Sequence, residues 1–371
     1  MLAKSIMLIA PLGFEEIDNG SLMARILIAD DGIEFDGNTA RERPLGGVES
    51  SIINLAGELA KRGHEVSVRN MCHQEKKIDG VFWAPLLKNG EYNVPEPVDL
   101  YIANRGHKLI NLMPASKRTA FWIHNPARYL LKWRYLYRLW RFKPEIIFIG
   151  NYHASTYPNW APGGERFIIP YGIAREFKRT NELKEIPSPK AIFTSNPLRS
   201  LDWLLDVWVN RIIPEVPNAQ LHLFSGSQTY GSVGDLKAKK MEDILLRASQ
   251  LQDKGVVIRG PIPKSQLIQE FSNSRVMLYR GDLNETFCLA VGEAQAAGVP
   301  AVVQNLGSVV ERVSNGKTGI IANSDKEFSD AAIAILNDDN TWQNYHRNAV
   351  KLQGFYTWER AANAFEELIN L

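Results

Sequence analysis

Short, continuous apolar runs alternate along the chain with longer stretches in which apolar residues recur every three or four positions. The short runs are bounded by turn residues and predict strands buried on both faces, while the longer stretches predict amphipathic helices. Strands are expected at residues 26–29, 65–68, 100–103, 120–123, 146–149, 167–169, 191–194, 220–224, 256–259, 276–279 and 301–304, and helices at 50–62, 203–209, 265–272 and 289–297. This alternation indicates parallel sheets with helices on both faces.

A polar and charged stretch at 179–190, which contains Pro187 and Pro189, interrupts the alternation and is interpreted as a linker. The length of 371 residues also exceeds what one hydrophobic core usually holds. The predicted class is therefore α/β, with two Rossmann-like doubly wound domains facing across a cleft. The expected parts are an N-terminal extension at 1–22, a first domain at 23–185, a second domain at 186–352 and a closing helix at 353–371. Residues 1–22 are interpreted as poorly packed, because the first convincing strand pattern follows Met23.

Composition and charge narrow the class of protein. The formal net charge of +2 is too small to indicate a nucleic-acid partner, and we expect none. The two cysteines, Cys72 and Cys288, form no C-x-x-C pair and fit a reducing compartment. No apolar run reaches the roughly 18 residues that a membrane span needs. We therefore expect a cytoplasmic protein.

The most specific segment of the sequence is residues 285–300, which follows the predicted strand 276–279. Glu285 lies near the start of the next helix and Glu293 follows eight residues later, so both are expected to project to the same side. Backbone N–H groups around Thr286 and Phe287, at a helix N-terminus, favour a phosphate. Carboxylates accept hydrogen bonds from sugar and ribose hydroxyls, so the segment predicts a nucleotide-sugar site.

This E-x7-E element, with the A-x-A-x-G-x-P that follows, resembles glycosyltransferase family 4, a retaining family with the GT-B fold. Further segments that resemble the family occur in the expected order, at 45–49, 169–173, 307–311, 315–319 and 355–360. The first of them contains Gly46 and Gly47, which are expected to let the backbone approach a phosphate or the acceptor. The resemblance implies retention at the anomeric carbon by front-face departure, in which the leaving phosphate helps to deprotonate the acceptor.

His124 directly follows the predicted strand 120–123, at the end where doubly wound sheets bind ligands. The string from Trp122 to Pro126 resembles the family's His-Asp-x-Pro segment, whose histidine contacts the donor sugar; here Asn125 replaces the aspartate. We expect His124 and Glu285 to orient the donor sugar and Glu293 to hold the ribose.

The start of the second domain departs from the family. Many relatives carry Gly-Arg-Leu-x-x-x-Lys-Gly, in which the two cations clamp the donor diphosphate. Here Arg199 aligns with the lysine, while Thr194 stands in place of the arginine. Arg199 can bind phosphate in a bidentate fashion, Ser195 and Asn196 can add neutral hydrogen bonds, and Arg280 can supply the second charge.

Other kinds of chemistry lack a signal. No D-x-D occurs and no His, Asp or Glu cluster has metal-ligand spacing, so we expect no metal and no cofactor. The expected partners are a nucleotide-sugar donor and a glycan, lipid-linked or small-molecule acceptor. The alternatives are a sugar-nucleotide epimerase or phosphorylase on the same fold, and a catalytically silent nucleotide-sugar-binding subunit, which the missing clamp residue favours.

Residues 128–143 form a local basic stretch, with six basic and no acidic residues among sixteen. On a helix, Arg134, Arg138 and Arg141 share one face, and aromatic residues share another. Two interpretations remain. The helix lies on an anionic membrane surface, which would place the enzyme beside a lipid-linked acceptor. Alternatively, it covers the first sheet with its arginine stems.

Overall fold

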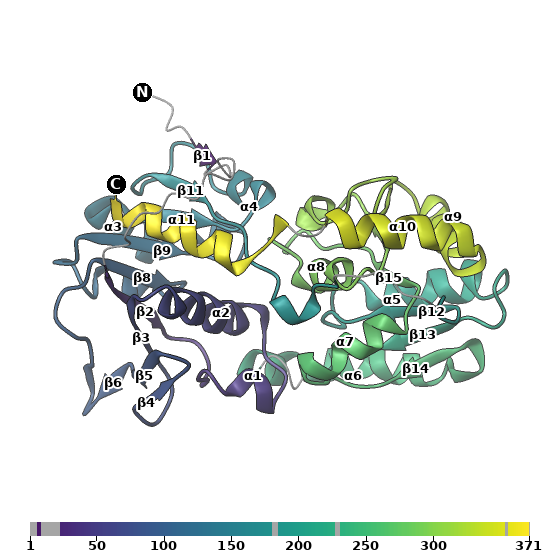
Figure 1. Ribbon diagram of the computed structural model, residues 1–371, viewed down its shortest axis with the longest axis horizontal. Coiled ribbons are helices and arrows are strands. Elements are labelled where there is room, and N and C mark those ends of the chain that lie inside the picture. The colour runs from purple at the N-terminus through teal and green to yellow at the C-terminus, as the bar shows by residue number, and fades with distance from the viewer. Residues whose placement is uncertain (1–5, 9–22, 180–184, 227–230, 353–354, 371) are drawn as a thin grey trace. The chain divides into compact units, whose positions relative to one another are not determined.

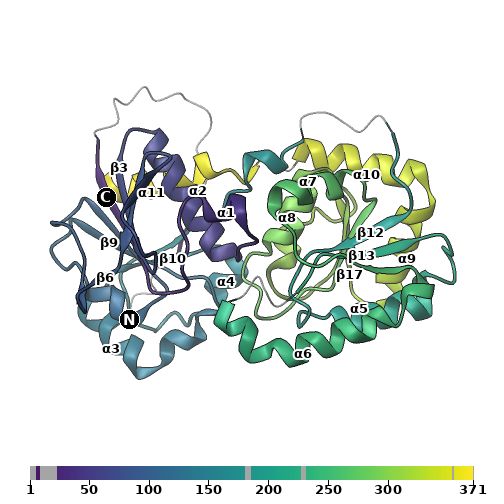
Figure 2. The same ribbon diagram turned by 90° about the horizontal axis from the view of Figure 1, so that it is seen from below.

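The computed structural model describes residues 6–8, 23–179, 185–226, 231–352 and 355–370 (Figures 1 and 2). The chain divides into two compact units. Unit 1 comprises Met1–Thr39, Gly47–Gly172 and Tyr356–Leu371, and unit 2 comprises Ala40–Gly46 and Ile173–Phe355. The division falls after Gly172, thirteen residues before the boundary that the sequence predicted at 185.

Unit 1 is built on a parallel sheet in the order β1-β11-β10-β9-β8-β2-β3-β5-β4, in which β4 and β5 alone pair antiparallel among the described strands. The strands are β1 (Ile6–Leu8), β2 (Arg25–Asp30), β3 (Glu65–Asn70), β4 (Lys76–Ile78), β5 (Val81–Pro85), β8 (Leu100–Asn104), β9 (Arg118–Trp122), β10 (Glu145–Phe148) and β11 (Arg166–Ile168), with a separate hairpin of β6 (Leu87–Lys88) and β7 (Glu91–Tyr92). Its helices are α2 (Gly47–Lys61), α3 (Trp133–Phe142), α4 (Asn151–Ser155) and α11 (Trp358–Asn370), and the short α1 (Thr39–Glu42) lies at the division between the units.

Unit 2 is built on a second sheet, parallel throughout, in the order β14-β13-β12-β15-β16-β17. Its strands are β12 (Lys190–Phe193), β13 (Gln220–Leu223), β14 (Val256–Ile258), β15 (Val276–Tyr279), β16 (Ala301–Gln304) and β17 (Gly319–Ala322). Its helices are α5 (Leu201–Val207), α6 (Gly231–Ser249), α7 (Lys264–Ser272), α8 (Leu289–Ala296), α9 (Asp325–Asn337) and α10 (Asp339–Leu352). The α/β class and the parallel sheets expected from the sequence are confirmed.

Residues Ile6–Leu8 correct the interpretation of 1–22 as a poorly packed extension. They form β1, which pairs in parallel with β11 through Ile6–Arg166, Met7–Phe167 and Leu8–Ile168. The edge of β11 has unpaired backbone groups that such a strand satisfies. The other residues of the expected extension lie outside the described part of the chain.

Helix α11 belongs to unit 1, where it packs on α2. The Arg62 guanidinium donates to a Glu366 carboxylate oxygen at 2.8 Å and to the Glu359 carbonyl at 2.8 Å. His64 accepts the Ala24 N–H at Nδ1, so its Nε2–H donates to the other Glu366 oxygen at 2.8 Å. These contacts tie the last helix to the first parallel strands of the unit.

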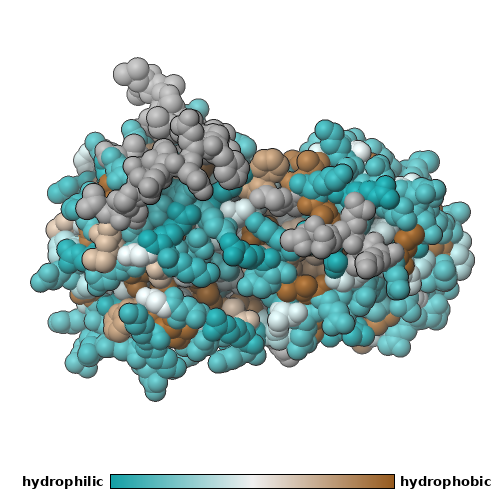
Figure 3. All heavy atoms as spheres, in the orientation of Figure 1, coloured by the Kyte–Doolittle hydropathy of each residue, from teal (hydrophilic) through white to brown (hydrophobic). Residues whose placement is uncertain are grey.

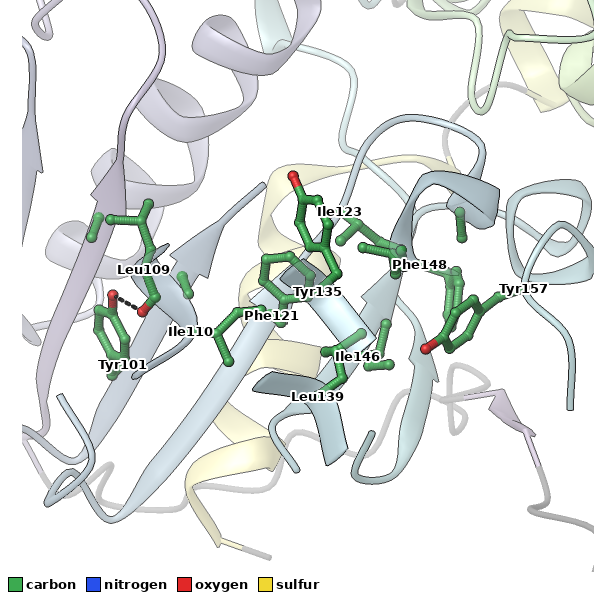
Figure 4. Close-up of a cluster of buried hydrophobic side chains, with 14 of the residues drawn as sticks. Tyr101, Leu109, Ile110, Phe121, Ile123, Tyr135, Leu139, Ile146, Phe148 and Tyr157 are labelled. Carbon is green, nitrogen blue, oxygen red and sulfur yellow. Dashed lines mark hydrogen bonds between the residues drawn. The ribbon is translucent and has the colours of Figure 1, made fainter. Parts of the chain in front are cut away.

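Helix α3 packs one face against the core of unit 1. Tyr135 and Leu139 are four residues apart, so they share a face, and both point into a buried apolar cluster with Phe121 and Ile146 (Figure 4). The opposite face stays exposed, with Trp133 at 77%, Tyr137 at 49% and Trp140 at 64% exposure. The face of the molecule in Figure 3 is mostly hydrophilic, with scattered hydrophobic patches. No described helix is both long enough and apolar enough to cross a membrane.

We expect Leu139→Ala to lower the free energy of unfolding by about 2–5 kcal/mol, because the wild-type side chain is fully buried and the truncation leaves a cavity. Tyr137→Ala, on the exposed face of the same helix, should change it by less than about 0.5 kcal/mol. Urea denaturation followed by circular dichroism measures both changes. Equal effects of the two variants would show that α3 does not dock through Leu139.

Candidate active site

The carboxyl ends of β15 and β16 carry two loops that lie against each other in unit 2. A Cβ on Gly281 would stand 2.5 Å from the Leu306 carbonyl oxygen, and one on Gly307 would stand 2.2 Å from that of Asp282. Both glycines also have positive φ, at 102° and 72°, so only glycine fits either position. This close approach fixes the segment that leads into α8.

Glu285 lies in the first of these loops and has two partners. The Arg199 guanidinium forms an ion pair with one carboxylate oxygen, and the Tyr279 hydroxyl donates to the other. Burial raises the pKa of Tyr279 and the Glu285 charge raises it further, so the phenol stays a hydrogen-bond donor at neutral pH. The structure thus brings together two predicted site residues, Glu285 and Arg199, which lie 86 positions apart in the sequence.

Glu293 lies inside α8, whose N-cap is Cys288 in the left-handed conformation, with φ of 64°. The Glu293 carboxylate is buried and forms an ion pair with Lys264, the first residue of α7. The Lys264 ammonium also lies 5.8 Å from the centre of the Phe177 ring. Sequence reasoning missed Lys264, although a cation directly after Pro263, at the start of a predicted helix, was a usable signal.

Thr286 and Phe287 stand between Glu285 and the N-cap of α8, and both are buried. The Arg312 guanidinium lies 4.0 Å from the centre of the Phe287 ring, which places a buried cation next to the helix N-terminus. Burial raises the pKa of the Cys288 thiol, and the Glu285 charge raises it further. Cys288 is therefore a protonated N-cap residue and not a nucleophile.

The residues expected to supplement Arg199 have structural contacts of their own. The Ser195 carbonyl accepts a hydrogen bond from the Ser225 hydroxyl, and the Asn196 side chain accepts the Leu198 N–H at 2.8 Å, which shapes the turn after β12. Arg280 donates to the Gln304 side chain at 2.9 Å, and its guanidinium lies 4.9 Å from the centre of the Trp203 ring. The structure therefore places Arg280 against β16 and α5.

In unit 1, polar side chains at the ends of β2 and β8 meet the start of α2. Arg105 donates to both oxygens of the fully buried Asp30, at 2.9 and 3.1 Å, and to Glu49 at 3.0 Å. Gly47 is the first residue of α2 and its carbonyl accepts the Ser51 hydroxyl at 2.6 Å. Gly46 and Gly47 stand on either side of the division between the units.

His124 lies within this polar group. The Asn104 amide donates to Asp30 at 2.6 Å, which leaves its carbonyl oxygen to accept from His124 Nε2. The proton is therefore assigned to Nε2, and Nδ1 accepts the Tyr171 hydroxyl. Burial lowers the pKa of His124 well below 6.5, and the Arg105 charge lowers it further, so the ring is neutral. A direct contact of the ring with a sugar would require one of these hydrogen bonds to open.

His153 positions the segment that follows His124. Its Nδ1 accepts the Ile149 N–H at 3.2 Å, so its Nε2–H donates to the Asn125 carbonyl at 2.8 Å. Sequence reasoning missed His153, Asp30, Asn104 and Arg105. The signal for the last three was their place directly after predicted buried strands.

No cluster of three or more His, Cys, Asp or Glu side chains that could hold a metal ion occurs among the residues that the structure describes. The two cysteines, Cys72 and Cys288, are both buried and unpaired with each other.

Comparison with known proteins finds a family model that matches part of unit 2. Residues 189–338 match the family model described as glycosyl transferases group 1. This segment covers most of unit 2, including Arg199, Lys264, Glu285 and Glu293. Residues 189–338 therefore resemble the glycosyl transferases group 1 family, and the family resemblance predicted from the sequence is confirmed.

Curated relatives match over about a third of this chain. A D-inositol 3-phosphate glycosyltransferase of Corynebacterium glutamicum is 28% identical over 120 residues, which is 32% of this chain and 28% of that protein. A probable sucrose-phosphate synthase of Thermosipho melanesiensis is 29% identical over 126 residues, which is 34% of this chain and 29% of that protein. The matched parts thus span less than a third of these relatives.

Solved structures match over almost the whole chain. The sucrose-phosphate synthase of Thermosynechococcus elongatus gives a TM-score of 0.71 at 15% identity, over 93% of this chain and 98% of that one. Anabaena HepE in complex with UDP and glucose gives a TM-score of 0.67 at 14% identity, over 94% and 99%. The likeness confirms the fold class, GT-B with two Rossmann-like domains.

The buried histidines make the stability of unit 1 depend on pH. Burial lowers the pKa of His153 to about 4 and holds that of His124 well below 6.5. Below pH 6.5 the unfolded chain binds protons that the folded chain does not. The free energy of unfolding should therefore fall as pH drops, by up to about 1.4 kcal/mol per pH unit for each histidine.

Urea denaturation at pH 7.5, 6 and 5 measures this slope. His153→Gln should reduce the slope, because the variant loses the buried imidazole whose pKa is lowered. A slope that is the same in wild type and His153→Gln would show that His153 titrates normally in the folded chain.

Proposed function

We propose that the chain transfers a sugar from a nucleotide-sugar donor to a hydroxyl group of an acceptor, with retention at the anomeric carbon and without a metal ion. The observation that carries the proposal is the pairing of Glu285 with Arg199 beside the N-terminus of α8, within the matched family domain. An anion-binding helix end, a cation and a buried carboxylate suit a ligand that has both a diphosphate and hydroxyl groups. The relatives named as glycosyltransferases, and the UDP and glucose bound to HepE, support the same class of donor.

Each site residue then has a role. Arg199 and the N–H groups of Thr286 and Phe287 bind the diphosphate, with neutral hydrogen bonds from Ser195 and Asn196. Glu293 holds the ribose, while Glu285 and His124 orient the donor sugar. Gly46 and Gly47 allow the backbone to approach the phosphate or the acceptor.

The reaction needs no covalent enzyme intermediate. The bond between the anomeric carbon and the phosphate oxygen breaks, and the departing diphosphate takes the proton of the acceptor hydroxyl on the same face. The acceptor oxygen then bonds to the anomeric carbon, so the configuration is retained. Arg199 and the α8 N-terminus stabilise the negative charge that develops on the diphosphate, and the sequence has no D-x-D to hold a metal there.

The test is hydrolysis and transfer with UDP-, GDP- and ADP-sugars, each with and without EDTA. We expect wild type to cleave at least one donor equally well with the chelator. Glu285→Gln should lower kcat/KM at least about 100-fold, because the variant loses the charge that faces the sugar, while donor affinity changes less than about fivefold. Asp330→Asn, on the outer face of α9, is the matched control and should behave as wild type.

Other outcomes favour the alternatives. Donor binding without cleavage or transfer would indicate a catalytically silent subunit, and interconversion of free nucleotide-sugars would indicate an epimerase. Activity that EDTA abolishes and magnesium or manganese restores would contradict the metal-free reaction.

We also propose that the exposed face of α3 lies on an anionic membrane surface in the cytoplasm, which would bring the enzyme to a lipid-linked acceptor. Trp133, Tyr137 and Trp140 project from this face, with the exposed Arg134 and Arg141 beside them. Aromatic and basic side chains in this arrangement suit the interface of an anionic bilayer. The opposite face of α3 packs on the core of unit 1 through Tyr135 and Leu139, which supports the other interpretation, that the helix covers the first sheet.

The third predicted membrane-facing arginine has a different contact. Arg138 is only half-exposed, and its guanidinium donates to the Asn111 side chain at 3.1 Å and to the Arg134 carbonyl at 3.2 Å. Arg138 therefore helps to hold α3 on unit 1, so the variants used in the membrane test should keep Arg138.

Vesicle co-sedimentation tests the membrane proposal. Wild type should pellet with vesicles that contain phosphatidylserine at low salt and should be released at high salt, because the attraction is screened. Arg134→Glu with Arg141→Glu, and separately Trp133→Ser with Trp140→Ser, should each weaken partitioning at least about tenfold. Leu246→Ser, an exposed apolar position on α6, is the control. Wild type that ignores anionic vesicles at low salt would contradict the membrane proposal and leave α3 as a helix that covers the sheet.

A further inference from the structure

Glu293 is buried in a way that requires a counter-charge. Only 6% of its side chain is exposed, and a carboxylate in such a place is costly unless it is paired. Lys264 supplies the pairing from another helix, and 29% of the lysine side chain remains exposed. The buried member of the pair is thus fixed in α8, while the cation reaches it from solvent at the end of a flexible side chain.

Glu285, the other carboxylate of the E-x7-E element, is likewise paired with a cation that is more exposed than the carboxylate itself. Glu285 is 11% exposed and its partner Arg199 is 34% exposed. Ser308, in the loop after β16, donates its backbone N–H to the Glu285 carbonyl at 3.4 Å. Its hydroxyl is fully buried and has no hydrogen-bond partner in the described structure. Each carboxylate is therefore paired with a cation that a ligand can displace. The Ser308 hydroxyl, near Glu285, can still form a hydrogen bond.

Lys264 is within reach of the phosphate position. Glu293 follows the N-cap Cys288 by five residues, or about 7.5 Å along the helix axis, and its side chain leans back toward the N-terminus. A lysine side chain extends roughly 6 Å, so a swing from Glu293 can carry its ammonium toward an anion at that helix end.

The other cations near the N-terminus of α8 have contacts that a ligand need not open. Arg312 lies over the Phe287 ring and forms an ion pair with Glu311. Arg199 occupies one of the two clamp positions and Thr194 stands at the other. Arg280 already contacts Gln304 and Trp203. The ion pair of Lys264 with Glu293 is a contact that ligand binding would break, because ribose hydroxyls can replace the ammonium group at the Glu293 carboxylate.

We propose that Lys264 is the second diphosphate-binding cation. In the donor-free chain it neutralises Glu293, and when ribose hydroxyls take over the carboxylate it moves to the diphosphate. The assignment rests on the function proposed above. In place of the clamp arginine, where this chain has Thr194, a lysine that changes its partner would bind the diphosphate.

Calorimetric titration with three probes tests the exchange: inorganic pyrophosphate, the nucleoside diphosphate among UDP, GDP and ADP that binds wild type best, and the matching nucleoside. Lys264→Gln should weaken binding of pyrophosphate and of the nucleoside diphosphate at least about tenfold, and should not weaken nucleoside binding, because the ribose no longer has to displace the lysine from Glu293. Lys264→Arg should restore diphosphate binding. Lys326→Gln, which removes an exposed lysine of α9, is the matched control and should change nothing.

Glu293→Gln should change the affinities for pyrophosphate and nucleoside in the directions opposite to those of Lys264→Gln. It should weaken nucleoside binding, because the ribose loses a carboxylate. It should also tighten pyrophosphate binding at least about threefold, because Lys264 no longer has to leave an anion. A purely structural ion pair would lower stability in both variants without separating the probes in this way.

The proposal is overturned if Lys264→Gln binds all three probes as wild type does, or if nucleoside and diphosphate affinities fall by the same factor. Failure of the enzymatic function is a separate result. A chain that shows the predicted binding pattern and transfers no sugar contradicts the transferase assignment alone, whereas one that binds no diphosphate contradicts both.

Discussion

A carboxylate that is taken out of water needs a compensating partner, and this requirement organises both candidate sites. Asp30 and Glu49 both pair with Arg105 in unit 1, and in unit 2 Glu285 pairs with Arg199 and Glu293 with Lys264. Each pair joins residues from different secondary-structure elements, so the loops at the strand ends are held together by charge as well as by packing. All three cations stay partly exposed, at 25% for Arg105, 29% for Lys264 and 34% for Arg199, so a charged ligand can reach them.

The parallel sheets determine where these carboxylates can stand. In a doubly wound unit the strand interiors are covered by helices, so polar side chains have room only at the strand ends. Asp30 and Asn104 are the last residues of the neighbouring strands β2 and β8, and His124 follows the next strand, β9. Glu285 follows a central strand of the other sheet. In unit 1 this produces a neutral histidine with a defined tautomer, and in unit 2 a carboxylate pair with two counter-cations.

The sequence predicted the part of the fold that local pattern encodes. The strands of both sheets that are buried on two faces, such as 276–279 and 301–304, were predicted to within a few residues, because continuous apolar runs have no other stable environment. Strand β1 was missed because its pairing depends on the distant β11. Arg199 and Glu285 were recognised separately from motifs, but their contact, and that of Lys264 with Glu293, depend on which loops the sheet order brings together. The exposed aromatic face of α3 could not be told from a buried one, since amphipathicity does not reveal which stripe meets the core.

The return of α11 to unit 1 has a consequence for the order in which the chain can fold. Unit 2 is formed by residues 40–46 and 173–355, so all of it has been synthesised before the helix that completes unit 1. During translation, unit 2 can close as soon as it leaves the ribosome, whereas Arg62 and His64 must wait for Glu366. The surface of α2 that α11 covers is therefore exposed on the chain until α11 has been made and packs there.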